Sequence, residues 1–206
     1  TEPLGERWER VLTLDSTSDA VMLKLSQEYQ DDETIYAAEH NGSLIALTHD
    51  GGTTWDWQRE SPERLLDLVV VDEDTLYAAI PDGRVLISTN HARSWEDPVD
   101  SELNDINMLS LAADGTLFAG SRDGHVSYST DGAGSFDRII EPLGTGDVQV
   151  LADVGFDGIG WAFAGTDVPD EGLWRWNPDK ACDWQQMDEE ITLLGDGQRI
   201  GGLLQG

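Results

Sequence analysis

The chain has little cysteine, few basic residues and no long apolar run. Its single cysteine, Cys182, excludes a disulfide bond within the chain. No apolar stretch reaches the length of a membrane span, and the first residues lack the composition of a signal peptide, so we expect no insertion into a membrane. The chain begins with Thr1 instead of methionine, from which we expect that a leader or an upstream region has been removed.

The shortage of basic residues leaves the chain strongly acidic. Twelve lysines and arginines stand against 41 aspartates and glutamates, which gives a formal net charge of −29. Only Lys24 and Lys180 are lysines. A surface of this charge repels DNA, RNA and anionic membranes, so we do not expect a nucleic-acid partner.

The acidic residues are spread along the whole chain and do not form one acidic tail. Two explanations stay open. One is adaptation to high salt, in which charges are screened, and the other is an ordinary acidic secreted protein. We favour the first. The predicted location is therefore either extracellular or the cytoplasm of a high-salt organism.

A polar segment that ends in an aromatic residue recurs along the chain. Its copies are THDGGTTW at 48–55, STNHARSW at 88–95, STDGAGSF at 129–136 and NPDKACDW at 177–184. When the copies are aligned on their last residue, an Asp or Asn stands five positions before the aromatic in each. A repeat period near 40 residues is typical of solenoids and of propeller blades.

Short apolar runs fill the rest of each repeat. The aromatic residues Tyr36, Tyr77, Phe118 and Phe163 are 41, 41 and 45 positions apart, each inside such a run. Runs such as GRVLIS alternate with period two, as a half-buried strand does. Four short strands per repeat predict an all-β chain, a β-propeller of four-stranded antiparallel blades. The predicted single domain has repeats at about 15–55, 56–95, 96–136 and 137–184, with partial blade strands at 6–14 and 185–206.

The recurring polar segment resembles the Asp-box, also called the BNR repeat. This box is found in sialidase-like propellers, sortilin-type receptor domains, a xyloglucanase family and a photosystem assembly factor family. The resemblance implies that each box is the hairpin between the third and fourth strands of a blade, and that its Asp accepts hydrogen bonds from its own turn. It also implies that glycine supplies unusual backbone angles and that the aromatic side chain is buried between blades.

These box residues are therefore assigned structural roles in preference to metal-binding or catalytic ones. They are Thr48, Asp50, Gly52, Trp55, Asn90, Trp95, Asp131, Gly134, Phe136, Asp179 and Trp184.

No catalytic constellation is evident in the sequence. A sialidase needs clustered arginines, but Arg84 and Arg122 fall near blade turns, and Arg59 and Arg64 in a connector. A glycoside hydrolase needs two carboxylates that face each other across a cleft, and no pair is marked among the 41 acids. The four histidines lack metal-ligand spacing, and no glycine-rich segment has a nucleotide-binding pattern. We predict no cofactor and no metal site.

Two tryptophans suggest a ligand surface. Trp174 and Trp176 are two positions apart, so they share one face of a predicted strand. The alternatives are core packing between blades, which we favour, and a surface for sugar stacking or peptide docking.

The predicted blades do not complete a ring. Either the chain is part of a six- to eight-bladed propeller, or a protein partner or a second copy completes it. We predict a non-catalytic acidic β-propeller that acts as a protein-binding or scaffold module within a larger assembly. The alternative is a glycoside hydrolase or a carbohydrate-binding propeller.

Overall fold

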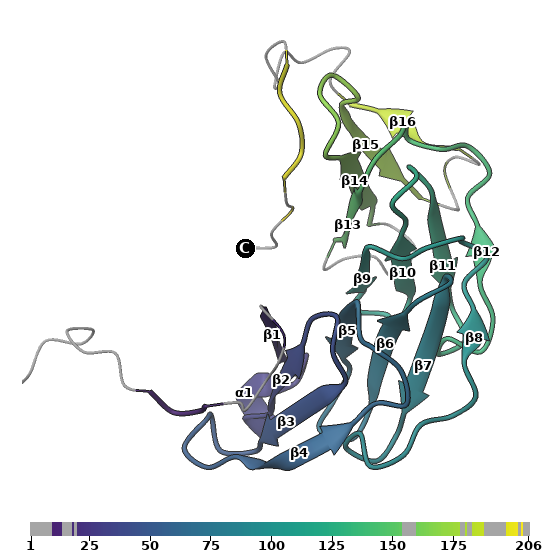
Figure 1. Ribbon diagram of the computed structural model, residues 1–206. Helices are drawn as coiled ribbons and strands as arrows, with labels where there is room; N and C mark the ends of the chain where they lie inside the picture. The colour runs from purple at the N-terminus through teal and green to yellow at the C-terminus, as the bar shows by residue number, and fades with distance from the viewer. Residues whose placement is uncertain are drawn as a thin grey trace, which may run out of the picture.

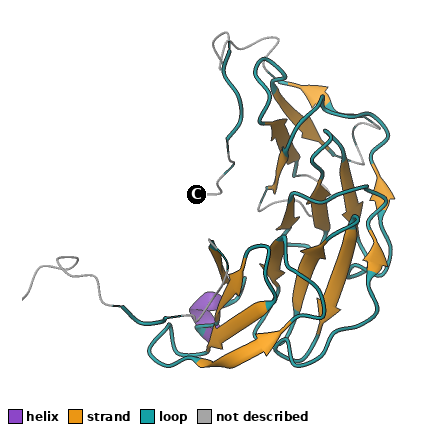
Figure 2. Cartoon of the chain, in the orientation of Figure 1, coloured by secondary structure: helices purple, strands orange, loops and turns teal. Residues whose placement is uncertain are grey.

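The computed structural model describes residues 10–13, 18, 20–153, 160–177, 180, 183–187, 197–201 and 203. Within these residues the chain forms sixteen strands and one four-residue helix, α1 (Tyr29–Asp32). The strands make four separate four-stranded antiparallel sheets that stand side by side in an open arc (Figures 1 and 2). The predicted all-β propeller of four-stranded blades is confirmed as a partial ring. No described helix is long and apolar enough to cross a membrane.

Each sheet is one blade and takes its strands in chain order. Blade 1 consists of β1 (Val21–Leu25), β2 (Ile35–Glu39), β3 (Leu44–Thr48) and β4 (Asp56–Glu60). Blade 2 consists of β5 (Asp67–Val70), β6 (Leu76–Ile80), β7 (Arg84–Ser88) and β8 (Val99–Asp100). Blade 3 consists of β9 (Met108–Leu111), β10 (Leu117–Gly120), β11 (Val126–Ser129) and β12 (Asp137–Arg138). Blade 4 consists of β13 (Val148–Ala152), β14 (Ala162–Thr166), β15 (Leu173–Trp176) and β16 (Gln185–Gln186).

The fourth strand of each blade follows the box of that blade. The predicted repeats end at the box aromatics, and each sheet extends a few residues beyond that boundary. Residues 185–186, which the sequence placed in a partial blade, are the outer strand of blade 4. The first strands of the four blades line the concave side of the arc, and the fourth strands lie along its outer rim (Figure 1).

The second strands are rich in alanine because both faces of each are covered. All five residues of β6 and all four of β10 are buried, and small side chains let the blades approach closely. The outermost strands β8, β12 and β16 have only two residues each, which leaves little unpaired backbone for pairing with other chains.

Apolar side chains fill the seams between consecutive blades. We call the face of a blade that is turned toward the preceding blade its leading face, and the opposite one its trailing face. In blade 2, Leu68 and Ala78 of the leading face belong to the cluster shared with blade 1. Tyr77 and Ala79 of its trailing face belong to the cluster shared with blade 3. Because successive side chains point to opposite faces of a strand, each strand contributes apolar residues to both neighbouring seams.

The chain continues along the trailing side of blade 4. The Ile200 N–H donates to the carbonyl of Thr166 over 3.1 Å, just as the Val148 N–H donates to Ser121 at the start of blade 4 over 2.9 Å. Ile200 also lies against Gly165, as Val148 lies against Gly120. Residues 197–201 therefore lie where the inner strand of a following blade would begin. Of the segment 6–14, only residues 10–13 are among the described residues.

Candidate functional site

The first box is held together by its aspartate. The carboxylate of Asp50 accepts the Thr48 hydroxyl over 2.7 Å and the Thr54 N–H over 2.8 Å. It also accepts the Thr54 hydroxyl over 2.6 Å. These donors come from the turn itself, as in an Asx-type turn, so Asp50 is fully engaged in shaping the hairpin.

The second and third boxes repeat this network with different chemistry. Asp131 accepts the Ser129 hydroxyl over 2.8 Å and the Ser135 hydroxyl over 2.7 Å. In blade 2 the neutral amide of Asn90 accepts the Ser94 N–H over 2.9 Å and donates to the Ser94 hydroxyl over 2.6 Å. The fourth box contains Asp179, which lies outside the described residues.

The box aspartates are acidified by these hydrogen bonds. The hydroxyl of Thr54, followed by its N–H, lowers the pKa of Asp50 from 3.8 to about 2. Ser135 and Ser129 lower the pKa of Asp131 from 3.8 to about 2 in the same way. Hydrogen bonds to the ionised form of a carboxylate favour that form.

A pH dependence of stability follows from these lowered pKa values. The ionised boxes stabilise the fold fully above about pH 4, and this contribution is lost as the pH falls through about 2. We expect the wild type to melt above an Asp50→Asn variant at neutral pH and to lose that advantage near pH 2. Thermal melts of both proteins across this range measure it. An advantage that does not change with pH would contradict the assigned role of the charge.

Each of the first three boxes has two consecutive residues with positive φ. In the first box both are glycines, Gly51 at 64° and Gly52 at 92°. In blade 2 the same positions hold His91 and Ala92, and in blade 3 Gly132 and Ala133. Gly134, which the sequence analysis lists among the structural box residues, is not one of the positive-φ residues. Ala133 holds the left-handed position equivalent to Gly52.

A methyl group at Gly51 isolates the cost of this backbone conformation. An added Cβ would lie 3.4 Å from the Tyr29 hydroxyl, so it fits sterically, while φ of 64° stays unfavourable. We expect Gly51→Ala to lower the free energy of unfolding by about 1 kcal/mol. Urea unfolding measures the change. Gly201→Ala is the control, because its Cβ meets nothing within 4 Å at a backbone without positive φ, and an equal loss there would refute the argument.

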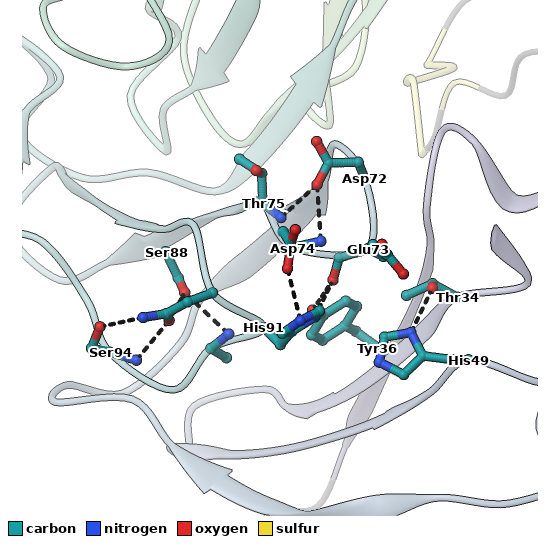
Figure 3. Close-up of polar contacts among 12 residues, drawn as sticks. Thr34, Tyr36, His49, Asp72, Glu73, Asp74, Thr75, Ser88, His91 and Ser94 are labelled. Atoms are coloured by element: carbon teal, nitrogen blue, oxygen red, sulfur yellow. Dashed lines mark hydrogen bonds and ion pairs between the residues drawn. The ribbon is translucent and has the colours of Figure 1, made fainter.

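On the rim where the boxes lie, side chains of blade 1 contact a loop and the box of blade 2. The Tyr36 hydroxyl donates to the Glu73 carbonyl over 2.8 Å, and His91 Nδ1 lies 2.9 Å from the same oxygen (Figure 3). His91 Nε2 lies 2.7 Å from an Asp74 carboxylate oxygen. Both partners of His91, the Glu73 carbonyl and the Asp74 carboxylate, are hydrogen-bond acceptors. His49 packs edge-on against this ring at 5.3 Å.

The predicted ligand surface at blade 4 is mostly core. Trp176 is 4% exposed, and its ring lies 4.9 Å from that of Tyr128 in blade 3. Trp184, the box aromatic, is also buried and lies 6.3 Å from Trp176. Trp174 packs partly buried against the same cluster and donates its indole N–H to the Glu171 carbonyl. Trp176 therefore does not present a surface to a sugar or a peptide.

The other box aromatics differ in burial. Phe136 is buried in the seam between blades 2 and 3, and Trp95 is partly buried in the seam between blades 1 and 2. Trp55 lies on the leading face of blade 1, where it lines an open groove of about 630 Å³.

A polar pocket lies on the opposite rim, where the loops between second and third strands meet the connectors between blades. It has a volume of about 340 Å³ and draws on blades 1, 2 and 3. Its polar lining consists of Asn41, Arg64, Asp82, Asn104, Asp105 and Arg122. We call this the arginine pocket.

The two guanidinium groups of the arginine pocket differ in their ion pairing. Arg122 Nε lies 3.2 Å from Asp105 and its Nη1 lies 3.5 Å from Asp147, so two carboxylates already neutralise it. Arg64 is exposed and takes part in none of the ion pairs found among the described residues. In sequence these arginines are 58 positions apart and looked scattered, because only the stacking of blades brings their loops together.

A metal site is not evident in the part of the chain that the structure describes. No group of three or more His, Cys, Asp or Glu side chains there is arranged to hold an ion. Among the acids of the blade 4 connections, Asp147 and Asp153 flank the first strand of blade 4, and Asp157 lies outside the described residues.

The fold and its boxes define a four-bladed arc of a β-propeller. No protein-family model matches the chain, and no curated protein matches its sequence. Among solved structures, the chain is similar to YCF48 bound to D1 peptide, with a TM-score of 0.60 and 15% identity over 86% of this chain and 55% of that one. YCF48 from Cyanidioschyzon merolae gives 0.59 and 18%, over 87% and 57%. A GH74 xyloglucanase from Xanthomonas campestris gives 0.58 and 13%, over 85% and 31%.

These likenesses concern the fold alone, at identities of 13 to 18%. The chain spans just over half the length of the YCF48 chains and less than a third of the xyloglucanase. The structural neighbours are propellers, consistent with the propeller architecture that the sequence resemblance implied.

Proposed function

We propose that the chain is a non-catalytic binding module that holds a segment of a protein partner in the arginine pocket. The observation that carries this proposal is the convergence of Arg64 and Arg122 in one concave site on a molecule of net charge −29. In such a molecule, a concave site with a guanidinium outside any described ion pair is a place where a carboxylate can approach. Arginine recognises carboxylates through its planar fork of N–H donors.

The rest of the pocket suits a peptide backbone. Asn41 and Asn104 lie at the pocket wall, where their amide nitrogens already contact His40 and Asp123. Each amide has a second N–H and a carbonyl oxygen with which it can bind a peptide backbone. Asp82 and Asp105 add acceptors for backbone N–H groups. The proposed ligand is therefore an extended peptide that carries one carboxylate for Arg64.

One structural neighbour supports a peptide ligand. A YCF48 propeller with a similar arc of blades has been solved with a D1 peptide bound. That observation belongs to YCF48, and this chain covers 55% of it. It supports a peptide as the class of ligand in this proposal.

The GH74 neighbours favour the second candidate, a carbohydrate-processing or carbohydrate-binding propeller. Such a site needs facing carboxylates and usually an aromatic platform for the sugar rings. Asp82 and Asp105 both line the arginine pocket, but none of its lining residues is aromatic, and Trp176 is buried. The pocket therefore fits a peptide better than an oligosaccharide.

The test is a peptide selection followed by a matched pair of arginine variants. A phage-displayed library of short random peptides is panned against the protein in molar salt, and enriched peptides are titrated by fluorescence polarisation. We expect peptides with an acidic residue or a critical C-terminal carboxylate, and a loss of about tenfold in affinity for Arg64→Ala. Arg138→Ala, an exposed arginine on β12, is expected to bind as the wild type does.

If Arg64→Ala and Arg138→Ala bind the selected peptides with equal affinity, the arginine pocket is not the binding site. Selection of no peptide, together with binding of xyloglucan oligosaccharides, would favour the second candidate.

A further inference from the structure

Blade 1 carries an arginine at a position where the other three blades carry an aliphatic side chain. Arg59 of the outer strand β4 pairs with Ile45 on β3. The equivalent pairs of the other blades are Val99 with Val85, Ile139 with Val126, and Met187 with Leu173. Arg59 therefore departs from the repeat, and it does so on the trailing face of blade 1, where Ile45 is buried in the seam with blade 2.

A second departure from the repeat lies in the box of blade 2. Arg93 stands where the first and third boxes have a threonine and a glycine. It directly follows Ala92, which is buried in the same apolar cluster as Ile45. The two arginines thus come from the two sides of one seam, Arg59 from the outer strand of blade 1 and Arg93 from the box of blade 2.

The charges of these side chains act on each other. Burial, followed by the nearby charge of Arg93, lowers the pKa of Arg59. Burial raises the pKa of Tyr36, and the charge of Arg59 opposes this rise, so the Arg59 guanidinium also lies near the Tyr36 hydroxyl in this seam. Two cations at close range repel each other, and an anion that contacts both removes this repulsion.

No acid of the described chain neutralises either arginine. Arg59 and Arg93 take part in none of the ion pairs found among the described residues. The charge of Asp56 acts on Arg59, but it is the weakest of the effects there. The Nη1 atom of Arg59 is buried without a hydrogen-bond partner. The chain has 41 acids against 12 lysines and arginines, and yet it leaves this pair of cations without an acidic partner.

We propose that Arg59 and Arg93 form a binding site for a doubly charged oxyanion of the phosphate type. Guanidinium groups bind phosphate oxygens through parallel N–H donors, so the buried Nη1 of Arg59 gains the acceptor that it lacks. Two guanidinium groups match the charge of a dianion, whereas the one unpaired guanidinium of the arginine pocket suits a single carboxylate. The site shares no residue with the arginine pocket, so this inference is independent of the proposed function.

The oxyanion has two possible sources, the free phosphate ion and the phosphoryl group of a phosphorylated side chain, which carries nearly two negative charges at neutral pH. The net charge of −29 opposes the approach of any anion, and salt screens this repulsion. Chloride, the background anion in KCl, has a single charge and cannot accept the parallel N–H donors of a guanidinium on separate oxygens. We expect a dissociation constant on the order of millimolar for free phosphate in molar KCl.

Thermal melting in phosphate tests the site. Potassium phosphate replaces KCl step by step at constant ionic strength, and an ion that binds only the folded chain raises the melting temperature. We expect a rise that saturates in the wild type, and an affinity about tenfold lower in Arg93→Gln. Arg138→Gln is the matched control, because Arg138 is an exposed arginine on β12, and it should respond as the wild type does.

Arg59→Met separates a binding role from a structural one. Methionine is the residue at the equivalent position of blade 4, Met187, so it suits this place in the outer strand. Before phosphate is added, the variant is expected to melt about 2 °C above the wild type, because it removes a buried N–H that has no acceptor. It is also expected to lose the saturable response to phosphate.

O-phosphoserine, titrated in the same way, distinguishes the two sources. Tighter binding of O-phosphoserine than of phosphate assigns a phosphorylated side chain, the reverse assigns the free ion, and either supports the site. A response that does not saturate and is equal in the wild type and all variants would overturn the proposal, since it reflects general exclusion of phosphate from protein surfaces. So would an Arg59→Met variant that melts below the wild type before phosphate is added, because the arginine would then serve the fold.

Discussion

Asp67→Ala is expected to lower the free energy of unfolding by about 3 kcal/mol, the largest effect of any single substitution that we predict. Asp67 is 7% exposed on β5, the inner strand of blade 2. Its carboxylate lies 2.6 Å from the ammonium of Lys24 on β1 and accepts the N–H of Leu109 on β9 over 2.8 Å. One side chain thus joins the inner strands of three blades, and its removal leaves a buried N–H and a cation without partners.

Urea unfolding in molar salt measures this effect, because the Asp67 carboxylate is buried and therefore little screened. The control is Glu63→Ala, which removes a bidentate pair with Arg84 at 2.8 and 2.9 Å. Its side chains are 33% and 31% exposed, so its loss should cost less than about 1 kcal/mol. Equal costs for the two variants would show that burial of the Asp67 carboxylate is not what matters.

Salt is expected to raise the melting temperature by at least about 10 °C between dilute buffer and about 2 M KCl, which corresponds to a few kcal/mol for a chain of this size. A net charge of −29 on 206 residues repels itself, and repulsion favours the expanded chain. The screening length falls from about 30 Å at 10 mM salt to about 3 Å at 1 M, which removes that penalty. This prediction tests the proposed adaptation to high salt.

Sucrose at matched osmolality is the control, since it strengthens burial without screening charge. A similar rise in sucrose would assign the effect to exclusion of the cosolute from the surface. A melting temperature that does not respond to salt would remove the halophilic explanation and favour an ordinary acidic secreted protein.

The repeat pattern was the strongest signal in the sequence because it depends on local physics. The period-two alternation of GRVLIS became β7, and the box at 48–55 became the turn between β3 and β4. The hydrogen bonds of Asp50 all lie within four residues of it in sequence. Interactions of such short range can be predicted without knowing the neighbouring blades.

The same reasoning is less specific where a turn accepts more than one residue type. The pattern lists Gly134 among the box residues, and the left-handed position equivalent to Gly52 is held by Ala133, with φ of 63°. Alanine is tolerated there because the surrounding hydrogen bonds fix the turn and offset its backbone strain. A motif therefore locates the turn more reliably than it assigns each angle.

The sequence by itself determined the strands, the boxes and the number of blades in this segment, because each depends on residues close together in the chain. Only the tertiary structure decided which side chains meet. Stacking of blades buried Trp176, joined Lys24 to Asp67, and gathered Arg64 and Arg122 into one pocket. These outcomes depend on contacts between residues about 40 or more positions apart, which are not encoded in any single repeat.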